Sequence, residues 1–88
     1  MKLIPLRQAQ TMWMNALRAK PFTSLTLYTF KKDRSVSLEQ KEGKLILHEN
    51  GYIHQDIELD GSKDKKLLKE AFSREFPRST RLYLSQTD

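Results

Sequence analysis

The chain has 88 residues, of which 31% are charged and 38% are hydrophobic, as is typical of one small folded domain rather than of a disordered segment. It contains no cysteine, so disulfide bonds, thiol nucleophiles and thiolate zinc sites are excluded. The net charge of +5 is uneven, because residues 1–32 carry six basic groups and no acid, whereas residues 33–62 carry three basic and seven acidic groups. A polyanion would therefore meet the ends of the chain rather than its middle.

The start of the chain, MKLIPLRQAQ, does not resemble a secretory signal, because Pro5 and Arg7 interrupt its apolar run. No stretch approaches the roughly 20 apolar residues that a membrane span needs. We therefore expect a cytoplasmic protein.

Apolar residues at helical spacing predict a first helix that begins near Pro5 and ends before Pro21. The residues that share its apolar face are Leu6, Ala9, Met12, Trp13, Ala16 and Leu17.

From Ser24 the hydrophobic period changes to two, which indicates strands. The runs around residues 25–28, 35–39, 45–48 and 52–59 are separated by polar turns at KKDR and KEGK and by the Asn-Gly of residues 50–51. These runs predict a four-stranded antiparallel meander.

Ser62 is placed as an N-cap for a second amphipathic helix, which Pro77 ends. Its apolar residues are Leu67, Leu68, Ala71, Phe72 and Phe76, and the alternation at residues 82–84 predicts a short fifth strand. The prediction is a single α+β domain over residues 1–88, with the order α-β-β-β-β-α-β and both helices on one face of an antiparallel sheet of four to five strands. The pairing of the last strand stays open.

The hairpin at Asn50-Gly51 allows two registers. A two-residue type I′ turn pairs Leu47 with His54 and places apolar residues on both faces of the hairpin. A three-residue loop, Glu49–Gly51 with Gly51 left-handed, pairs Leu47 with Ile53 and gathers the apolar residues on one face. We favour the three-residue loop because it buries a complete apolar set.

In that register the outer face of the sheet carries a candidate interaction surface for a second copy of the chain or for another protein. Its residues are Ile46, His48, Tyr52 and His54. His48, His54 and Asp56 match a two-histidine, one-carboxylate metal set in type, but such residues are usual on a solvated sheet face, so we predict no metal site. A pH-sensitive patch is a further alternative. We expect Tyr28, Phe30 and Tyr52 to be core or subunit-contact residues rather than a platform for single-stranded nucleic acid, because the middle strands are acidic.

Lysines gather in the first turns of the second helix, at Lys63, Lys65, Lys66 and Lys69. Lysine opposes the helix dipole there, so these residues either form a solvated helix face or bind an anion such as phosphate. Arg18 and Lys20 on the first helix would extend a polyanion site.

This lysine cluster resembles the one on the second helix of double-stranded-RNA-binding domains, whose element order also begins with a helix, strands and a helix. The resemblance covers about a dozen residues and implies that Lys65, Lys66 and Lys69 clamp phosphates across a groove. The chain departs from that pattern by an extra strand before the helix and another after it. We therefore expect a partner that is either duplex RNA or DNA, or a protein.

We expect no enzyme and no cofactor, because the chain has no glycine-rich phosphate loop, nucleophile elbow or His-Glu-x-x-His. Asp33, Glu39 and Lys41 loosely resemble the Asp…Glu-x-Lys set of restriction-endonuclease-like nucleases. All three fall on one short strand and its turn, whereas that family draws them from two strands.

Overall fold

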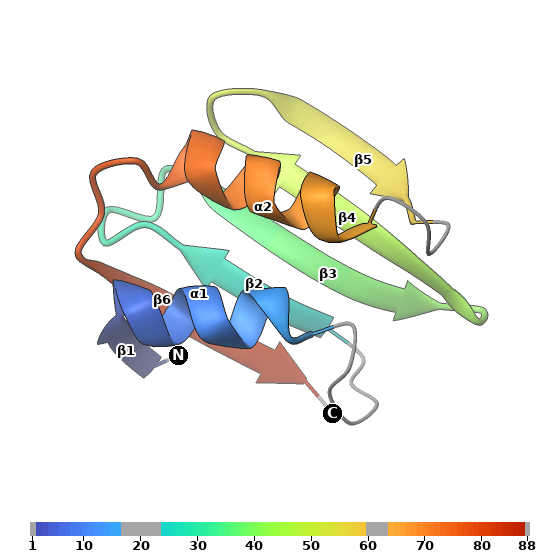
Figure 1. Cartoon of the computed structure of the whole chain (residues 1–88), viewed down its shortest axis with the longest axis horizontal. Coiled ribbons are helices and arrows are strands. Elements are labelled where there is room, and N and C mark those ends of the chain that lie inside the picture. The colour runs from blue at the N-terminus through green and yellow to red at the C-terminus, as the bar shows by residue number, and fades with distance from the viewer. Residues whose placement is uncertain (1, 17–23, 60–63, 88) are drawn as a thin grey trace.

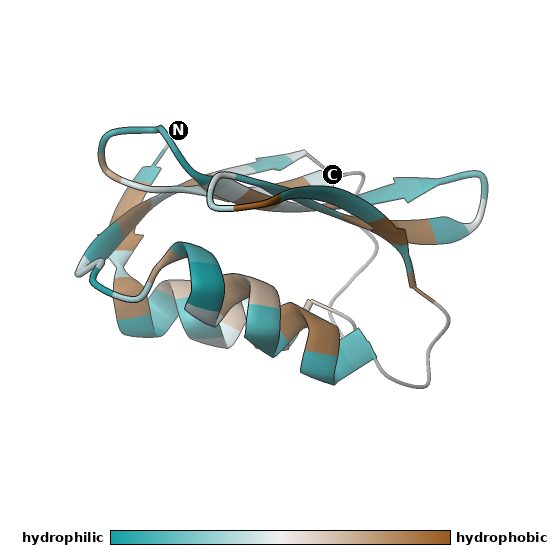
Figure 2. Cartoon of the chain, turned by 90° about the horizontal axis from the view of Figure 1, so that it is seen from above, coloured by the Kyte–Doolittle hydropathy of each residue, from teal (hydrophilic) through white to brown (hydrophobic). Residues whose placement is uncertain are grey.

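Six antiparallel strands form one sheet, and two helices cover one of its faces (Figures 1 and 2). The computed structural model describes residues 2–16, 24–59 and 64–87. In chain order the elements are β1 (Lys2–Pro5), α1 (Leu6–Met14), β2 (Ser24–Tyr28), β3 (Ser35–Lys41), β4 (Lys44–Asn50), β5 (His54–Glu58), α2 (Asp64–Glu75) and β6 (Arg81–Thr87). The predicted α+β class, the meander and the placement of both helices on one face are confirmed.

The strand order is β1-β6-β2-β3-β4-β5, so the C-terminal strand lies between the first two strands. The strand β1 comes in addition to the predicted elements, and its four residues pair with β6 through positions such as Ile4 and Leu82. A run of four residues carries too little periodicity to identify a strand. Its extended form depends on the partner strand that the end of the chain supplies.

The core lies between the helices and the inner face of the sheet, which Figure 2 shows edge-on. Alternate strand residues and one stripe of each helix are buried, as their periods require. The buried apolar residues are Ile4, Ala9, Trp13, Ala16, Leu25, Leu27, Val36, Leu38, Leu47, Leu68, Ala71, Phe72, Phe76 and Leu82. The indole Nε1 of Trp13 donates a 2.9 Å hydrogen bond to the carbonyl of Leu68, which joins the two helices.

The start of α1 and the end of α2 lie close to the predicted positions, but α1 ends earlier than predicted. It ends at Met14 with Asn15 as its C-cap, so Ala16, which the prediction places on the helix, follows it in a turn. Pro5 is the N-cap of α1, and α2 ends at Glu75, two residues before Pro77. The predicted N-cap Ser62 and the predicted stop Pro21 lie outside the described residues. Neither described helix is long and apolar enough to cross a membrane.

The register of the β4–β5 hairpin corrects the prediction. Leu47 pairs with Ile57, and His48 pairs with Asp56, so the connecting loop is Gly51–Ile53 and not Glu49–Gly51. The pairing slips by an even number of residues, so the two faces of the hairpin are those predicted. The two-residue turn, which pairs Leu47 with His54, is wrong as well.

Candidate functional site

Three loops meet at one end of the sheet, on the left of Figure 1. They are the β2–β3 turn (residues 29–34), the β4–β5 loop (residues 51–53) and the α2–β6 connection (residues 76–80). A groove of about 700 Å³ lies among them. Its lining residues are Thr29, Lys31, Asp33, Arg34, Tyr52, Arg74, Glu75, Pro77, Arg78 and Ser79. Segments far apart in the sequence therefore share one surface.

A second groove of about 550 Å³ adjoins the first. The two share Thr29, Lys31 and Arg78, and the second adds Phe30 and Arg81. We call this part of the molecule the basic end. It comprises the groove-lining cations Lys31, Arg34, Arg78 and Arg81, the cation of Lys32 beside the Tyr83 ring, and the exposed rings of Phe30 and Tyr52.

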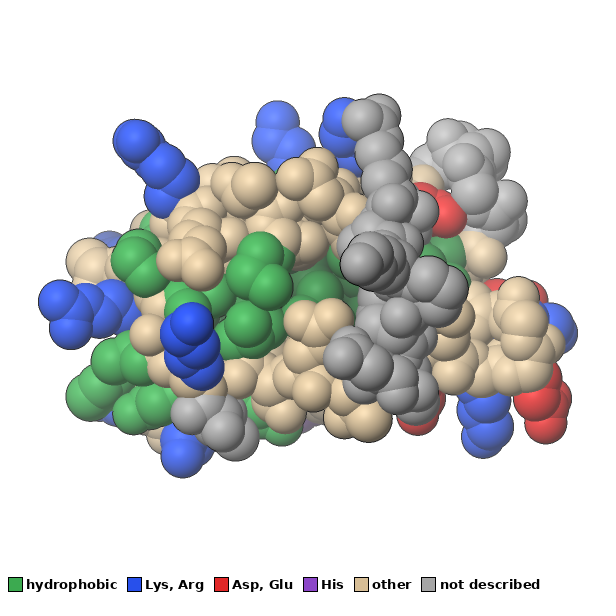
Figure 3. All heavy atoms as spheres, turned by 90° about the horizontal axis from the view of Figure 1, so that it is seen from below, with side chains coloured by type: hydrophobic (Ala, Val, Ile, Leu, Met, Phe, Trp, Pro, Cys, Tyr) green, Lys and Arg blue, Asp and Glu red, His purple; other side chains and the backbone are tan. Residues whose placement is uncertain are grey.

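Two carboxylates line the grooves, and each accepts hydrogen bonds from neighbouring groups. Asp33 accepts a 2.6 Å hydrogen bond from the Thr29 hydroxyl, which lowers the pKa of this exposed carboxyl group. Glu75 accepts the amide hydrogens of Tyr52 and Ile53. In Figure 3 the left half shows Lys and Arg side chains beside apolar ones, whereas the right half shows the visible Asp and Glu side chains together with further Lys and Arg side chains.

The β2–β3 turn is held in one conformation by Thr29. The amide of Lys32 donates to the Thr29 carbonyl at 2.8 Å, and the amide of Thr29 donates to the Arg34 carbonyl at 3.0 Å. The Thr29 hydroxyl oxygen also accepts the amide hydrogens of Asp33 and Arg34 at 3.2 and 3.3 Å. Lys32 adopts the left-handed region, with φ of 60°. The turn therefore presents its tip residues in a defined arrangement.

Phe30 and Tyr52 are the exposed large hydrophobic side chains among the described residues, at 65% and 70% exposure. The ring of Phe30 stacks on that of Tyr83, with centroids 6.0 Å apart and planes inclined by 18°. Lys32 places its Nζ 4.9 Å from the centroid of Tyr83. Of the two predicted alternatives, a place in the core is wrong for Phe30 and Tyr52, since both rings lie on the surface, and a subunit contact stays a prediction.

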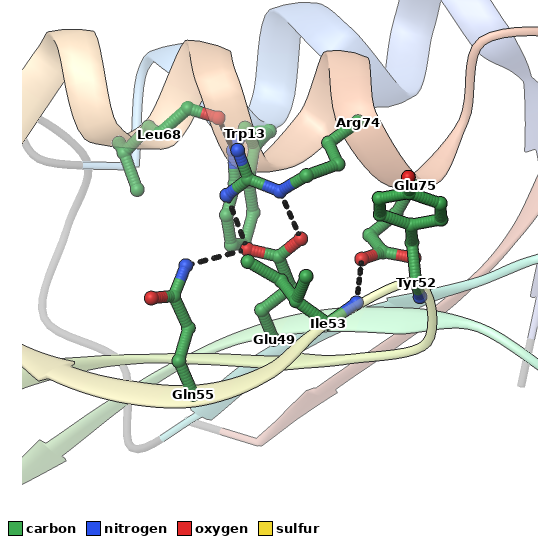
Figure 4. A network of polar contacts seen from close by, with 8 residues as sticks. All are labelled: Trp13, Glu49, Tyr52, Ile53, Gln55, Leu68, Arg74 and Glu75. Atoms are coloured by element: carbon green, nitrogen blue, oxygen red, sulfur yellow. Dashed lines mark hydrogen bonds and ion pairs between the residues drawn. The ribbon is translucent and has the colours of Figure 1, made fainter.

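A buried polar network between α2 and the β4–β5 hairpin adjoins the basic end (Figure 4). Arg74 donates from Nε and Nη2 to the two carboxylate oxygens of Glu49 at 2.7 and 2.6 Å, and the Gln55 amide donates to the same carboxylate at 2.9 Å. Glu75 accepts from the amides of Tyr52 and Ile53 at 2.7 and 3.3 Å. The network joins α2 to the β4–β5 loop.

The two buried glutamates of this network have pKa values shifted in opposite directions. Burial raises the pKa of Glu49, but hydrogen bonds from Arg74 and its other partners outweigh burial and hold the value below the ordinary one. Burial, together with the neighbouring Glu49, raises the pKa of Glu75. Of the two carboxyl groups, Glu75 therefore takes up a proton more readily than Glu49 does.

Gly51 is required by close approach and not by its backbone angle. A Cβ at this position would collide with the Glu75 carboxylate and with the side chain of Arg34. The predicted left-handed conformation of Gly51 is wrong, since Gly43 is the described glycine with positive φ, at 78°. Gly51 thus lets the β4–β5 loop reach the end of α2.

The predicted lysine site lies at the other end of α2. Lys65, Lys66 and Lys69 are exposed on the helix, whereas the basic end surrounds the residues that follow its C-terminus. Arg18, Lys20 and Lys63 lie outside the described residues. The structure brings none of the described lysines of this set to the two grooves.

On the outer sheet face His48 lies next to Asp56, as predicted, and also next to Glu39. His48 Nδ1 is bonded to Asp56, and Nε2 lies 3.2 Å from Glu39. Partial burial lowers the pKa of His48, but these two carboxylates outweigh burial and raise it. His54 lies apart from this cluster, with Nδ1 3.4 Å from the Asn50 side chain.

The other two residues of the predicted interaction surface lie apart from each other. Ile46 is half-buried on the outer face, and Tyr52 lines the groove at the basic end. Within the described residues, no group of three His, Cys, Asp or Glu side chains is placed to hold a metal ion. Asp33 precedes β3, whereas Glu39 and Lys41 lie towards its far end, so the nuclease-like set is not assembled.

The sequence prediction missed the basic end. The sequence analysis treats the segment KKDR only as a polar turn and assigns no role to Arg78 and Arg81. The available signal was an aromatic residue, Phe30, directly before two lysines in a turn. Comparison of the chain with protein-family models, with curated proteins and with solved structures finds no match, so the candidate site rests on its own geometry.

Proposed function

We propose that the protein is a non-catalytic nucleic-acid-binding domain and that its basic end contacts the phosphate backbone. The observation that carries the proposal is the convergence of cations from two separate segments on two adjoining grooves. Lys31 and Arg34 come from the β2–β3 turn, and Arg78 and Arg81 come from the segment after α2. The facing Asp33 is already bonded to Thr29.

The arrangement suits a polymer of phosphates better than a single phosphate group. Exposed lysine and arginine side chains spread along extended grooves give many weak, salt-sensitive contacts, which characterise binding to a nucleic-acid backbone. Exposed aromatic rings at both grooves add surfaces on which bases stack. Clustered charge of one sign also steers a polyanion towards this end.

The predicted helix-two lysines form a second candidate contact. From Lys65 and Lys66 to the C-terminus of α2, where the basic end begins, the helix rises by roughly 15 Å. A nucleic acid long enough to follow the helix would touch both surfaces. Charge reversal at each surface separately distinguishes their contributions.

The test is fluorescence anisotropy with labelled single strands and duplexes at 50 and 200 mM salt. We expect binding to weaken steeply as salt rises, with roughly one unit less salt slope for each phosphate contact removed. Lys31→Glu should weaken binding, whereas Lys41→Glu, an equal charge change at the end of β3 that lies away from the basic end, should not. The affinity of Lys65→Glu measures whether the lysines of α2 also contact the nucleic acid.

Absence of binding to either nucleic acid at 50 mM salt would refute the proposal. Equal loss in Lys31→Glu and Lys41→Glu would show an effect of net charge alone. Binding that is lost in Lys65→Glu and kept in Lys31→Glu would place the contact on α2.

A second candidate function is self-association through the outer sheet face. Both helices lie on the other face, and Ile46 is half-buried there beside β5, which is an edge strand. Light scattering at high protein concentration tests it. A monomer mass would exclude the homodimer.

A further inference from the structure

We propose that the basic end selects single-stranded over duplex nucleic acid by stacking an unpaired base on Phe30; this inference rests on the proposed function. The ring of Phe30 is 65% exposed and lies almost parallel to the ring of Tyr83. One face of the pair is thus backed by protein, and Phe30 continues the stack towards solvent. A base placed on it would lengthen a stack that already exists.

The support beneath Phe30 is rigid. Tyr83 belongs to β6, which is hydrogen-bonded to β1 on one side and to β2 on the other, where Tyr83 pairs with Tyr28. Phe30 itself lies in the turn that Thr29 closes with its carbonyl and hydroxyl groups. Little conformational freedom remains to be lost when a base binds, so the stacking energy is retained.

Cations surround this stack at positions suited to the backbone of the same strand. Lys32 reaches the ring of Tyr83, and Arg78 and Arg81 line the groove that contains Phe30. Lys31 lines both grooves, and the adjoining one leads to the second exposed ring, Tyr52. A positively charged groove with exposed aromatic rings is the usual composition of single-strand sites.

The internal base pairs of a duplex cannot stack on Phe30. Bases inside a duplex are covered on both faces by their neighbours, so Phe30 could reach only a terminal pair, whereas an unpaired strand can turn a base towards it. The acidic strands do not oppose this, because two strands lie between β6, which carries Tyr83, and β4, and three lie between β6 and β5.

The test compares a labelled ten-nucleotide DNA strand with an abasic strand that carries the same number of phosphates. Phe30→Ala should weaken binding of the normal strand roughly five- to hundredfold and leave the abasic strand unchanged. Phe30→Trp should preserve or tighten binding. Lys32→Asn removes a cation while keeping a residue that tolerates positive φ, so it should weaken both strands alike.

The fluorescence of the buried Trp13 reports whether each variant is folded. Equal affinity for the normal and abasic strands, or no effect of Phe30→Ala, would overturn the stacking proposal while nucleic-acid binding stands. No binding of any strand or duplex at 50 mM salt would remove the proposed function itself. A dimer that Phe30→Ala converts to a monomer without changing affinity would assign Phe30 to a subunit contact.

Discussion

Arg74 on α2 and Glu49 on β4 form a bidentate ion pair with both hydrogen bonds shorter than 2.8 Å. The Glu49 side chain is fully buried, whereas 30% of the Arg74 side chain is exposed. Removal of the arginine leaves a carboxylate in the core without its charge partner. The pair therefore controls how firmly β4 is held against α2.

Arg74→Ala should lower the free energy of unfolding by about 3 kcal/mol, because breaking a buried pair leaves the other charge uncompensated. Urea denaturation followed by Trp13 fluorescence measures the change. The matched control is Arg78→Ala, which removes an exposed arginine at the same end of α2 and should stay within about 0.5 kcal/mol of the wild type. Similar losses in both variants would contradict the assigned role of the pair.

Glu75→Gln should change how stability depends on pH. The raised pKa of Glu75 means that the folded protein holds this proton more tightly than the unfolded chain does. The contribution of Glu75 to the free energy of unfolding is complete below the ordinary glutamate pKa of 4.5, and it is lost as pH rises through the raised pKa. The variant should therefore gain stability relative to the wild type as pH rises from 4.5 towards 7.

Denaturation curves at several pH values test this prediction. Glu70→Gln removes an equal charge from the exposed side of α2 and serves as the control. A Glu75→Gln curve parallel to the wild type would show that Glu75 ionises as it does in the unfolded chain.

His48 should stabilise the fold at low pH. Its pKa is raised in the folded protein, so its contribution is complete below the ordinary value of 6.5 and disappears as pH rises through the raised value. His48→Gln should cost stability at pH 6 and less at pH 8. The control is His54→Gln, which removes the histidine that lies beside the Asn50 side chain and outside the carboxylate cluster. A pH titration by NMR of both imidazole rings gives the direct measurement.

Gly51→Ala should destabilise the protein by about 1–3 kcal/mol, since the methyl group displaces the Glu75 carboxylate or Arg34 from a tightly packed position. Gly43→Asn is the control. Gly43 has positive φ and open space around its Cβ position, and asparagine tolerates that backbone region. Thermal unfolding of both variants tests the difference. If Gly51→Ala were neutral, the β4–β5 loop would not need its close approach to α2.

The local spacing of hydrophobic residues was sufficient to predict most helices and strands. The helical stripe that includes Ala9 and Trp13 identified α1, and the i, i+4 spacing of Leu68 and Phe72 identified α2, because one face of each helix must be buried. The period of two identified four meander strands. Burial also fixed which face of the β4–β5 hairpin points inward, although the exact register was wrong.

That register was decided by contacts that the local sequence does not contain. Arg74, 25 residues further along the chain, pairs with Glu49 and allows β4 to continue with a buried glutamate. Glu75 accepts the amides of Tyr52 and Ile53 and so holds the loop where it is. A charged residue next to Asn-Gly looks like part of a turn until its distant partner is known.

The sequence by itself determined the α+β class, the two amphipathic helices, the meander and the concentration of positive charge outside the middle of the chain. These follow from periodicity and composition, which are local. Tertiary structure alone decided that β6 lies between β1 and β2, that Phe30 stacks on Tyr83, and that two distant basic segments share adjoining grooves. Strand order and loop convergence depend on contacts between residues far apart in the chain, and no local pattern encodes which segments meet.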